Sequence, residues 1–141
     1  MTNSSLAKSY LKKAIARLGL LPILQKRRAY SDVVREAQEI VELALKGMLR
    51  QVGLEPPKWH DVGGILIKHA DRFEPRVSAR IQALAEASEW LRAEREMSFY
   101  GDVDLIPTEE YGPQHGRRAA AAARLAVQTA RWVIKPVRRQ S

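Results

Sequence analysis

The chain has 141 residues, no cysteine and a formal net charge of +8, and 45% of its residues are hydrophobic. The length suits one domain, and the hydrophobic fraction is typical of a globular protein rather than a disordered one. The lack of cysteine excludes disulfides, thiol catalysis and cysteine-based zinc or iron–sulfur sites, and three scattered histidines do not make a metal cage. We therefore expect one domain over residues 1–141, with its core at about 6–132, and we expect neither a metal nor a cofactor.

The sequence contains no segment typical of a membrane protein. Its longest uncharged run, Leu18 to Gln25, has eight residues, far fewer than the roughly 20 that cross a bilayer. The N-terminus has no secretory apolar stretch with a cleavage site. We therefore expect a cytoplasmic protein that does not bind membranes. A single asparagine and 28% charged residues favour a thermophilic source.

The first half of the chain is predicted to form two helices. Apolar residues at three-and-four spacing predict one helix from Ser5 to Arg28, with a kink or break where Gly19 and Pro22 interrupt it. A second helix has a continuous apolar face. It is expected to begin at Ser31 as N-cap, with Asp32 in its first turn, and to end at Gly53 before two prolines.

The second half is predicted to contain three more helices. They span about Val62–Ile67, Pro75–Ser98 and Gln114–Lys135, and a loop fills Phe99–Pro113. No segment of any length alternates apolar and polar residues as a strand does. The predicted fold class is therefore all-α, an up-and-down bundle of four to five helices.

The charge is distributed unevenly along the chain. Residues 1–28 and residues 113–141 each contain seven bases and no acid, whereas residues 29–112 contain all 16 acids and ten bases. Because the ends of a small helical bundle often lie close together, the two basic segments are expected to form one positive surface that suits a polyanion or an acidic partner. The alternative is a solvated surface that only keeps the protein soluble.

Four arginines in the last segment recur every seven residues: Arg117, Arg124, Arg131 and Arg138. On a helix this spacing keeps the first three in one row, and Pro136 is expected to end the helix before the basic tail at 136–141. A row of guanidinium groups can pair with successive phosphates. Aromatic residues are few and mostly lie elsewhere in the sequence, so a platform for base stacking is not indicated.

Two further groups of residues are candidate sites. His60 and Asp61 precede the third helix, where Asp61 suits an N-cap, and the functional alternative makes His60 a general acid or base or a phosphate ligand. Arg92, Arg95 and Tyr100 end the fourth helix beside several glutamates. They fit either a solvated, ion-paired helix end or a cationic pocket beside an aromatic ring for a nucleotide.

Several of these runs resemble the HEPN family of "higher eukaryote and prokaryote nucleotide-binding" domains, of the stand-alone archaeal and bacterial type. The resemblance covers about Leu6–Trp132. It rests on the segments Glu42–Leu49, Gly53–Gly63, Leu91–Gly101 and Ile106–Tyr111. It implies a bundle of four to five helices that forms a homodimer and binds nucleotide or cleaves RNA without metal in toxin-antitoxin or defence systems, often beside a minimal nucleotidyltransferase.

The ribonuclease members of this family have an arginine followed by four to six residues and a histidine. No histidine of this sequence has an arginine at that distance, since nine residues separate Arg50 from His60. The first hypothesis is therefore a HEPN-like protein that binds nucleotide or RNA and acts with a nucleotidyltransferase partner. One alternative is a metal-independent ribonuclease with His60 and Arg95 as catalytic residues. The other is a non-catalytic, antitoxin-like scaffold.

Overall fold

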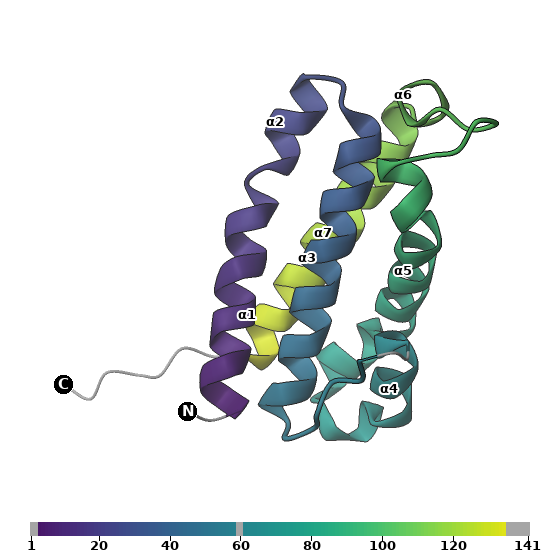
Figure 1. The fold of residues 1–141 in the computed structure, drawn as a ribbon. Coiled ribbons are helices and arrows are strands. Elements are labelled where there is room, and N and C mark those ends of the chain that lie inside the picture. The colour runs from purple at the N-terminus through teal and green to yellow at the C-terminus, as the bar shows by residue number, and fades with distance from the viewer. Residues whose placement is uncertain (1–2, 59–60, 135–141) are drawn as a thin grey trace.

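The computed structural model describes residues 3–58 and 61–134. Within these residues it contains seven α-helices, one 3₁₀ turn and no strand, so the predicted all-α class is confirmed (Figure 1). The long helices are α1 (Asn3–Leu18), α3 (Tyr30–Gln51), α5 (Pro75–Phe99) and α7 (Pro113–Val133). The short elements are α2 (Leu21–Lys26), α4 (Val62–Lys68), the 3₁₀ turn η1 (Ala70–Arg72) and α6 (Pro107–Glu110).

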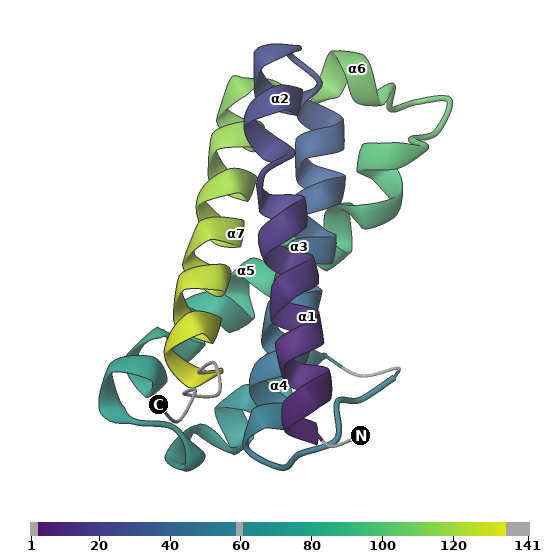
Figure 2. The same cartoon turned by 90° about the vertical axis from the view of Figure 1, so that its left-hand side faces the viewer.

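Helix α3 lies at the centre of the bundle and packs against α1, α5 and α7 (Figures 1 and 2). Its predicted apolar face is buried, and each valine, isoleucine, leucine or methionine side chain on it contributes about 1.5–3 kcal/mol on burial. The buried apolar residues of α3 are Val33, Val34, Ala37, Ile40, Val41, Ala44, Leu45, Met48 and Leu49. Because α3 contacts every other long helix, it sets the position of the surfaces described below.

The two ends of α3 test the predicted caps. At the C-terminus Gly53 adopts a φ of +83°, and the Leu54 amide donates a 2.9 Å hydrogen bond to the Leu49 carbonyl, which is a Schellman motif. The prediction for Gly53 is confirmed. The prediction that Ser31 is the N-cap is wrong, because the chain turns at Arg28, with a φ of +59°, and the helix starts at Tyr30. Asp32 does lie in the first turn.

The first predicted helix is divided as expected. Helix α1 ends at Leu18 and α2 begins at Leu21, with Pro22 in its first turn. Proline fits there because the first amides of a helix have no partner within it. The helix count exceeds the predicted five because of this break and because the 99–113 loop contains the single turn α6.

Helix α4 begins at Val62, and the side chain of the preceding residue, Asp61, accepts a 3.0 Å hydrogen bond from the Gly63 amide. The N-cap prediction for Asp61 is therefore confirmed. The α5–α6 loop turns through Gly101, with a φ of +69°, and an isolated bridge between Asp102 and Leu105. Lys135, Pro136, Arg138 and the 136–141 tail lie outside the described residues. No helix in the described ranges is long and apolar enough to span a membrane.

Candidate nucleic-acid interface

The arginine row predicted from the sequence lies on the exposed face of α7. Arg117, Arg124 and Arg131 are exposed and alternate with Ala121 and Gln128 along this face. At 1.5 Å per residue the row extends for about 21 Å. Arg124 and Arg131 line an open groove of about 610 Å³ between α7 and Leu18 of α1. We call these three arginines and this groove the α7 surface.

Helices α1 and α2 both contact α7, and Figure 2 shows them side by side. The basic N-terminal segment and the described part of the basic C-terminal segment therefore meet on one side of the bundle, as the charge distribution predicted. Among residues 3–58 and 61–134, none of Arg117, Arg124 and Arg131 forms an ion pair with a carboxylate. No acid occurs in residues 1–28 or 113–141, so neither segment supplies a carboxylate to this surface, although Arg17 of the first segment pairs with Glu36 of α3.

Two tryptophans lie beside this cationic face. The Arg118 guanidinium lies 3.9 Å from the Trp90 ring centroid, and the Arg80 guanidinium lies 4.1 Å from that of Trp132. Arg80 also donates a 2.9 Å hydrogen bond to Gln128. These two tryptophans, although distant from most of the basic residues in the sequence, lie against arginine side chains in the folded chain. Guanidinium groups cover the rings of Trp90 and Trp132. The two rings therefore hold arginine side chains in place and do not form a platform for base stacking.

Arg92 and Arg95 are in a different environment. Arg92 Nη1 lies 3.4 Å from Asp61 Oδ1, and Arg92 Nε lies 3.9 Å from Glu42 Oε1. Arg95 Nη2 lies 3.9 Å from Glu39 Oε1. The two arginines, together with Lys58 of the connector before α4, line a polar cleft of about 270 Å³ over α3. Both cations are partly neutralised by carboxylates of neighbouring elements.

Asp61 and Tyr100, two further predicted site residues, are both exposed. Asp61 is exposed and contacts Arg92 through its carboxylate. Tyr100 is exposed and its ring packs on Phe99, with 4.9 Å between ring centroids. The described aromatic ring that lies near a guanidinium at this end is Phe99, 5.7 Å from Arg35, and not Tyr100. His60 lies outside the described residues.

Tyr111 is buried and contacts two other titratable residues, Glu94 and His115. Its hydroxyl donates a 2.5 Å hydrogen bond to Glu94 Oε2. Burial, together with the hydrogen bond and the negative charge of Glu94, raises the pKa of Tyr111 well above its ordinary value. His115 contacts the same ring edge-on and accepts a hydrogen bond from the Gly112 amide through Nδ1. This arrangement holds the start of α7 against α5.

Sequence reasoning missed the two tryptophan contacts. Arg76 and Arg80 are four residues apart and share a helix face, which is visible in the sequence. Their common partner, Trp132, belongs to α7 and is close only in the folded chain. In the described ranges there is no cluster of three or more histidine, aspartate or glutamate side chains that could hold a metal ion.

These features define an all-α bundle with a cationic face, and comparison with known families identifies its class. The family model of the HEPN domain matches residues 7–140, so the chain belongs to the HEPN family. The resemblance derived from the sequence is thereby confirmed. Membership places the chain among domains with nucleotide-related or RNA-related functions. No curated protein and no solved structure matches the chain significantly.

Proposed function

We propose that this HEPN-family protein binds nucleotide or RNA through the α7 surface. The observation that carries the proposal is the row of three exposed arginines without a carboxylate partner in the described part of the chain. Phosphate groups bind such a row by displacing condensed counterions. The tryptophan-stacked guanidinium groups of Arg80 and Arg118 extend the positive face from α7 toward α5.

The proposed biological setting comes from the family. We propose that the protein acts as a homodimer with a minimal nucleotidyltransferase partner in a toxin-antitoxin or defence-type module. The support for this setting is the family membership. The basic surface adds a physical reason for an anionic ligand, because positive potential raises the rate of encounter with polyanions.

Binding to short single-stranded RNA, ATP and GTP at two salt concentrations tests the proposal. The logarithm of the RNA affinity is expected to fall linearly with the logarithm of the salt concentration. The double variant Arg124→Ala/Arg131→Ala is expected to bind more weakly and to lower the magnitude of that slope by about 1.4, roughly 0.7 for each phosphate contact removed on a single strand. The absence of all binding at low salt would overturn the proposal.

The matched control changes the net charge by the same two units in another part of the molecule. This control is Lys68→Glu, because Lys68 ends α4 and lines neither the α7 surface nor the cleft of Arg92 and Arg95. If binding depends on the α7 surface, this control keeps most of the affinity. An equal loss in both variants would instead indicate attraction by net charge alone.

A second candidate function is metal-independent RNA cleavage by His60 with an arginine. One contact favours Arg92 as that arginine over Arg95, because Arg92 interacts with Asp61, the residue that follows His60 in the sequence. A guanidinium group can stabilise a phosphorane, and a neutral histidine can take the proton from a ribose 2′-hydroxyl. EDTA-resistant cleavage that is lost in His60→Ala and in Arg92→Ala would support this function.

The same assays test the non-catalytic, antitoxin-like scaffold. In that case the protein purifies with a protein partner and binds neither nucleotide nor RNA. Native mass spectrometry of the protein isolated from its own cells reports partner subunits and retained nucleotide in one measurement.

A further inference from the structure

Exposed apolar side chains gather at one end of the bundle. Of the nine large hydrophobic residues that are exposed in the described part of the chain, seven lie on or next to α2 and the end of α5: Leu20, Ile23, Met97, Phe99, Tyr100, Val103 and Ile106. A group of this size, unlike single exposed residues, is typical of an interaction site. We call residues 20–28 the α2 segment and residues 99–110 the acidic loop.

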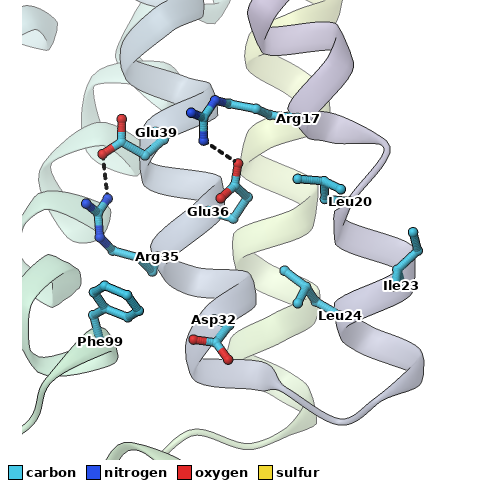
Figure 3. Close-up of a pocket in the computed structure, with 9 residues that line it drawn as sticks. All are labelled: Arg17, Leu20, Ile23, Leu24, Asp32, Arg35, Glu36, Glu39 and Phe99. Carbon is cyan, nitrogen blue, oxygen red and sulfur yellow. Dashed lines mark hydrogen bonds and ion pairs between the residues drawn. The ribbon is translucent and has the colours of Figure 1, made fainter.

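A groove of about 520 Å³ separates the α2 segment from Phe99 (Figure 3). Leu20, Ile23 and Leu24 form one wall and Phe99 forms the other, and α3 makes the floor. Ile23 is 53% exposed and Phe99 is 51% exposed, so the apolar walls are open to solvent.

Charged residues of α1 and α3 also line this groove, and all but one of them are paired within the described ranges. Arg17 lies 2.8 Å from Glu36, and Arg35 lies 2.6 Å from Glu39 (Figure 3). Asp32 has no cationic partner in the described ranges. The groove therefore suits an occupant that combines apolar side chains with a positive charge.

The two sides of the groove have opposite charge. The α2 segment ends in exposed Lys26, Arg27 and Arg28, and no acid occurs before Asp32. Residues 96–116 contain five acids and no base. Four of these acids are exposed in the acidic loop: Asp102, Asp104, Glu109 and Glu110.

We infer that a second copy of this chain docks across the groove, with the α2 segment of each copy against the acidic loop and the Asp32 side of the other. The inference rests on the homodimer included in the proposed function and assigns its interface. Each protomer has both the α2 segment and the acidic loop at the same end of the bundle (Figure 1). A two-fold axis therefore pairs the α2 segment of each copy with the acidic loop of the other, so the same contact forms twice. The apolar walls form the centre of the interface and the charges form its rim.

A pair of variants with equal side-chain chemistry tests this interface. Ile23→Glu places a carboxylate in the groove, whereas Ile67→Glu makes the same change on α4, where Ile67 is 46% exposed. Because both residues are exposed, both variants are expected to fold, which circular dichroism verifies. In sedimentation equilibrium, Ile23→Glu is expected to raise the dimer dissociation constant at least about tenfold. Ile67→Glu is expected to leave it unchanged.

Exchange of charges tests the specific pairing of the two patches. One variant, Lys26→Glu/Arg27→Glu, has an acidic α2 segment, and the other, Asp104→Lys/Glu109→Lys, has a basic loop. Each alone is expected to dimerise weakly, because like charges then face each other. An equimolar mixture of the two is expected to form a heterodimer, since both contacts are again between opposite charges. Failure of the mixture to associate would overturn the pairing.

The outcomes separate the inference from the proposed function. A dimer that Ile23→Glu does not weaken overturns the inference and leaves the proposed homodimer standing. A chain that is monomeric at all concentrations overturns both. RNA binding is read out separately through Arg124 and Arg131, which lie outside this interface.

Discussion

Gly63 of α4 lies directly against Ala85 of α5. A Cβ placed on residue 63 would be 2.7 Å from the Ala85 Cα and 2.8 Å from its Cβ. Helix α4 can therefore approach the backbone of α5 only with glycine at this position. This contact fixes where Asp61, at the start of α4, meets Arg92 of α5.

We predict that Gly63→Ala destabilises the protein by about 1–3 kcal/mol, the usual cost of overpacking a well-packed site. The neighbouring Gly64 is the control, because a Cβ there would be 3.9 Å from the nearest atom, the Asp61 Oδ2. Gly64→Ala is expected to be neutral or to stabilise by up to about 1 kcal/mol, since alanine favours helix. Urea unfolding measures both, and equal effects would contradict this account of the contact.

The structure also distinguishes a residue that caps a helix from one that only looks like a cap in the sequence. Asp61→Ala removes the acceptor of the Gly63 amide hydrogen bond and is expected to cost about 1 kcal/mol. Ser31→Ala is expected to change stability by less than about 0.5 kcal/mol, because α3 starts before Ser31 and its N-cap is Ala29. Thermal unfolding of both variants checks this contrast, and a larger cost for Ser31→Ala would contradict it.

Tyr111 should make the stability depend on pH in the alkaline range. Its pKa is higher in the folded protein than the ordinary value of 10.0, first because it is buried and second because it bonds to Glu94. The folded state therefore holds the phenolic proton more tightly than the unfolded chain does. The stabilisation is complete below pH 10 and is lost as the pH rises above it, by about 1.4 kcal/mol per pH unit for one proton.

Comparison of the wild type with Tyr111→Phe isolates this contribution from lysine titration. The wild type is expected to lose stability faster than the variant above pH 10, as measured by urea unfolding at a series of pH values. Parallel curves above pH 10 would show that Tyr111 does not keep its proton in the folded state.

The contact between Arg118 and Trp90 should couple α7 to α5 energetically. With 3.9 Å between the guanidinium carbon and the ring centroid, a double-mutant cycle of Arg118→Ala and Trp90→Leu is expected to give a coupling energy of about 0.5–1 kcal/mol. Additive effects of the two substitutions would show that the contact does not contribute to stability.

The sequence was most informative where local rules decide the conformation. The break at Gly19 and Pro22, the end of α3 at Gly53 and the N-cap at Asp61 each depend on backbone conformation or a hydrogen bond within a few residues. The prediction for the N-cap of α3 is wrong by two residues, Ser31 instead of Ala29, because the chain turns at Arg28 with a positive φ and the helix starts at Tyr30. No general preference of arginine predicts that conformation.

The candidate site was only partly predictable. The seven-residue spacing of Arg117, Arg124 and Arg131 predicts one helix face, and α7 presents that face to solvent. Arg92 and Arg95 also lie on one helix face, so spacing alone does not predict that these two are ion-paired while the arginines of α7 are not. The difference arises from Glu39, Glu42 and Asp61, which belong to α3 and to the start of α4.

The sequence by itself determined that the chain is all-α, that its basic residues are concentrated at its two ends, and that it resembles the HEPN family. These properties follow from residue spacing, composition and local motifs. Only the tertiary structure decided which arginines are neutralised, which are held against Trp90 and Trp132, and which apolar side chains remain exposed beside α2. The physical reason is that ion pairing, ring contacts and burial depend on residues brought together from distant parts of the chain.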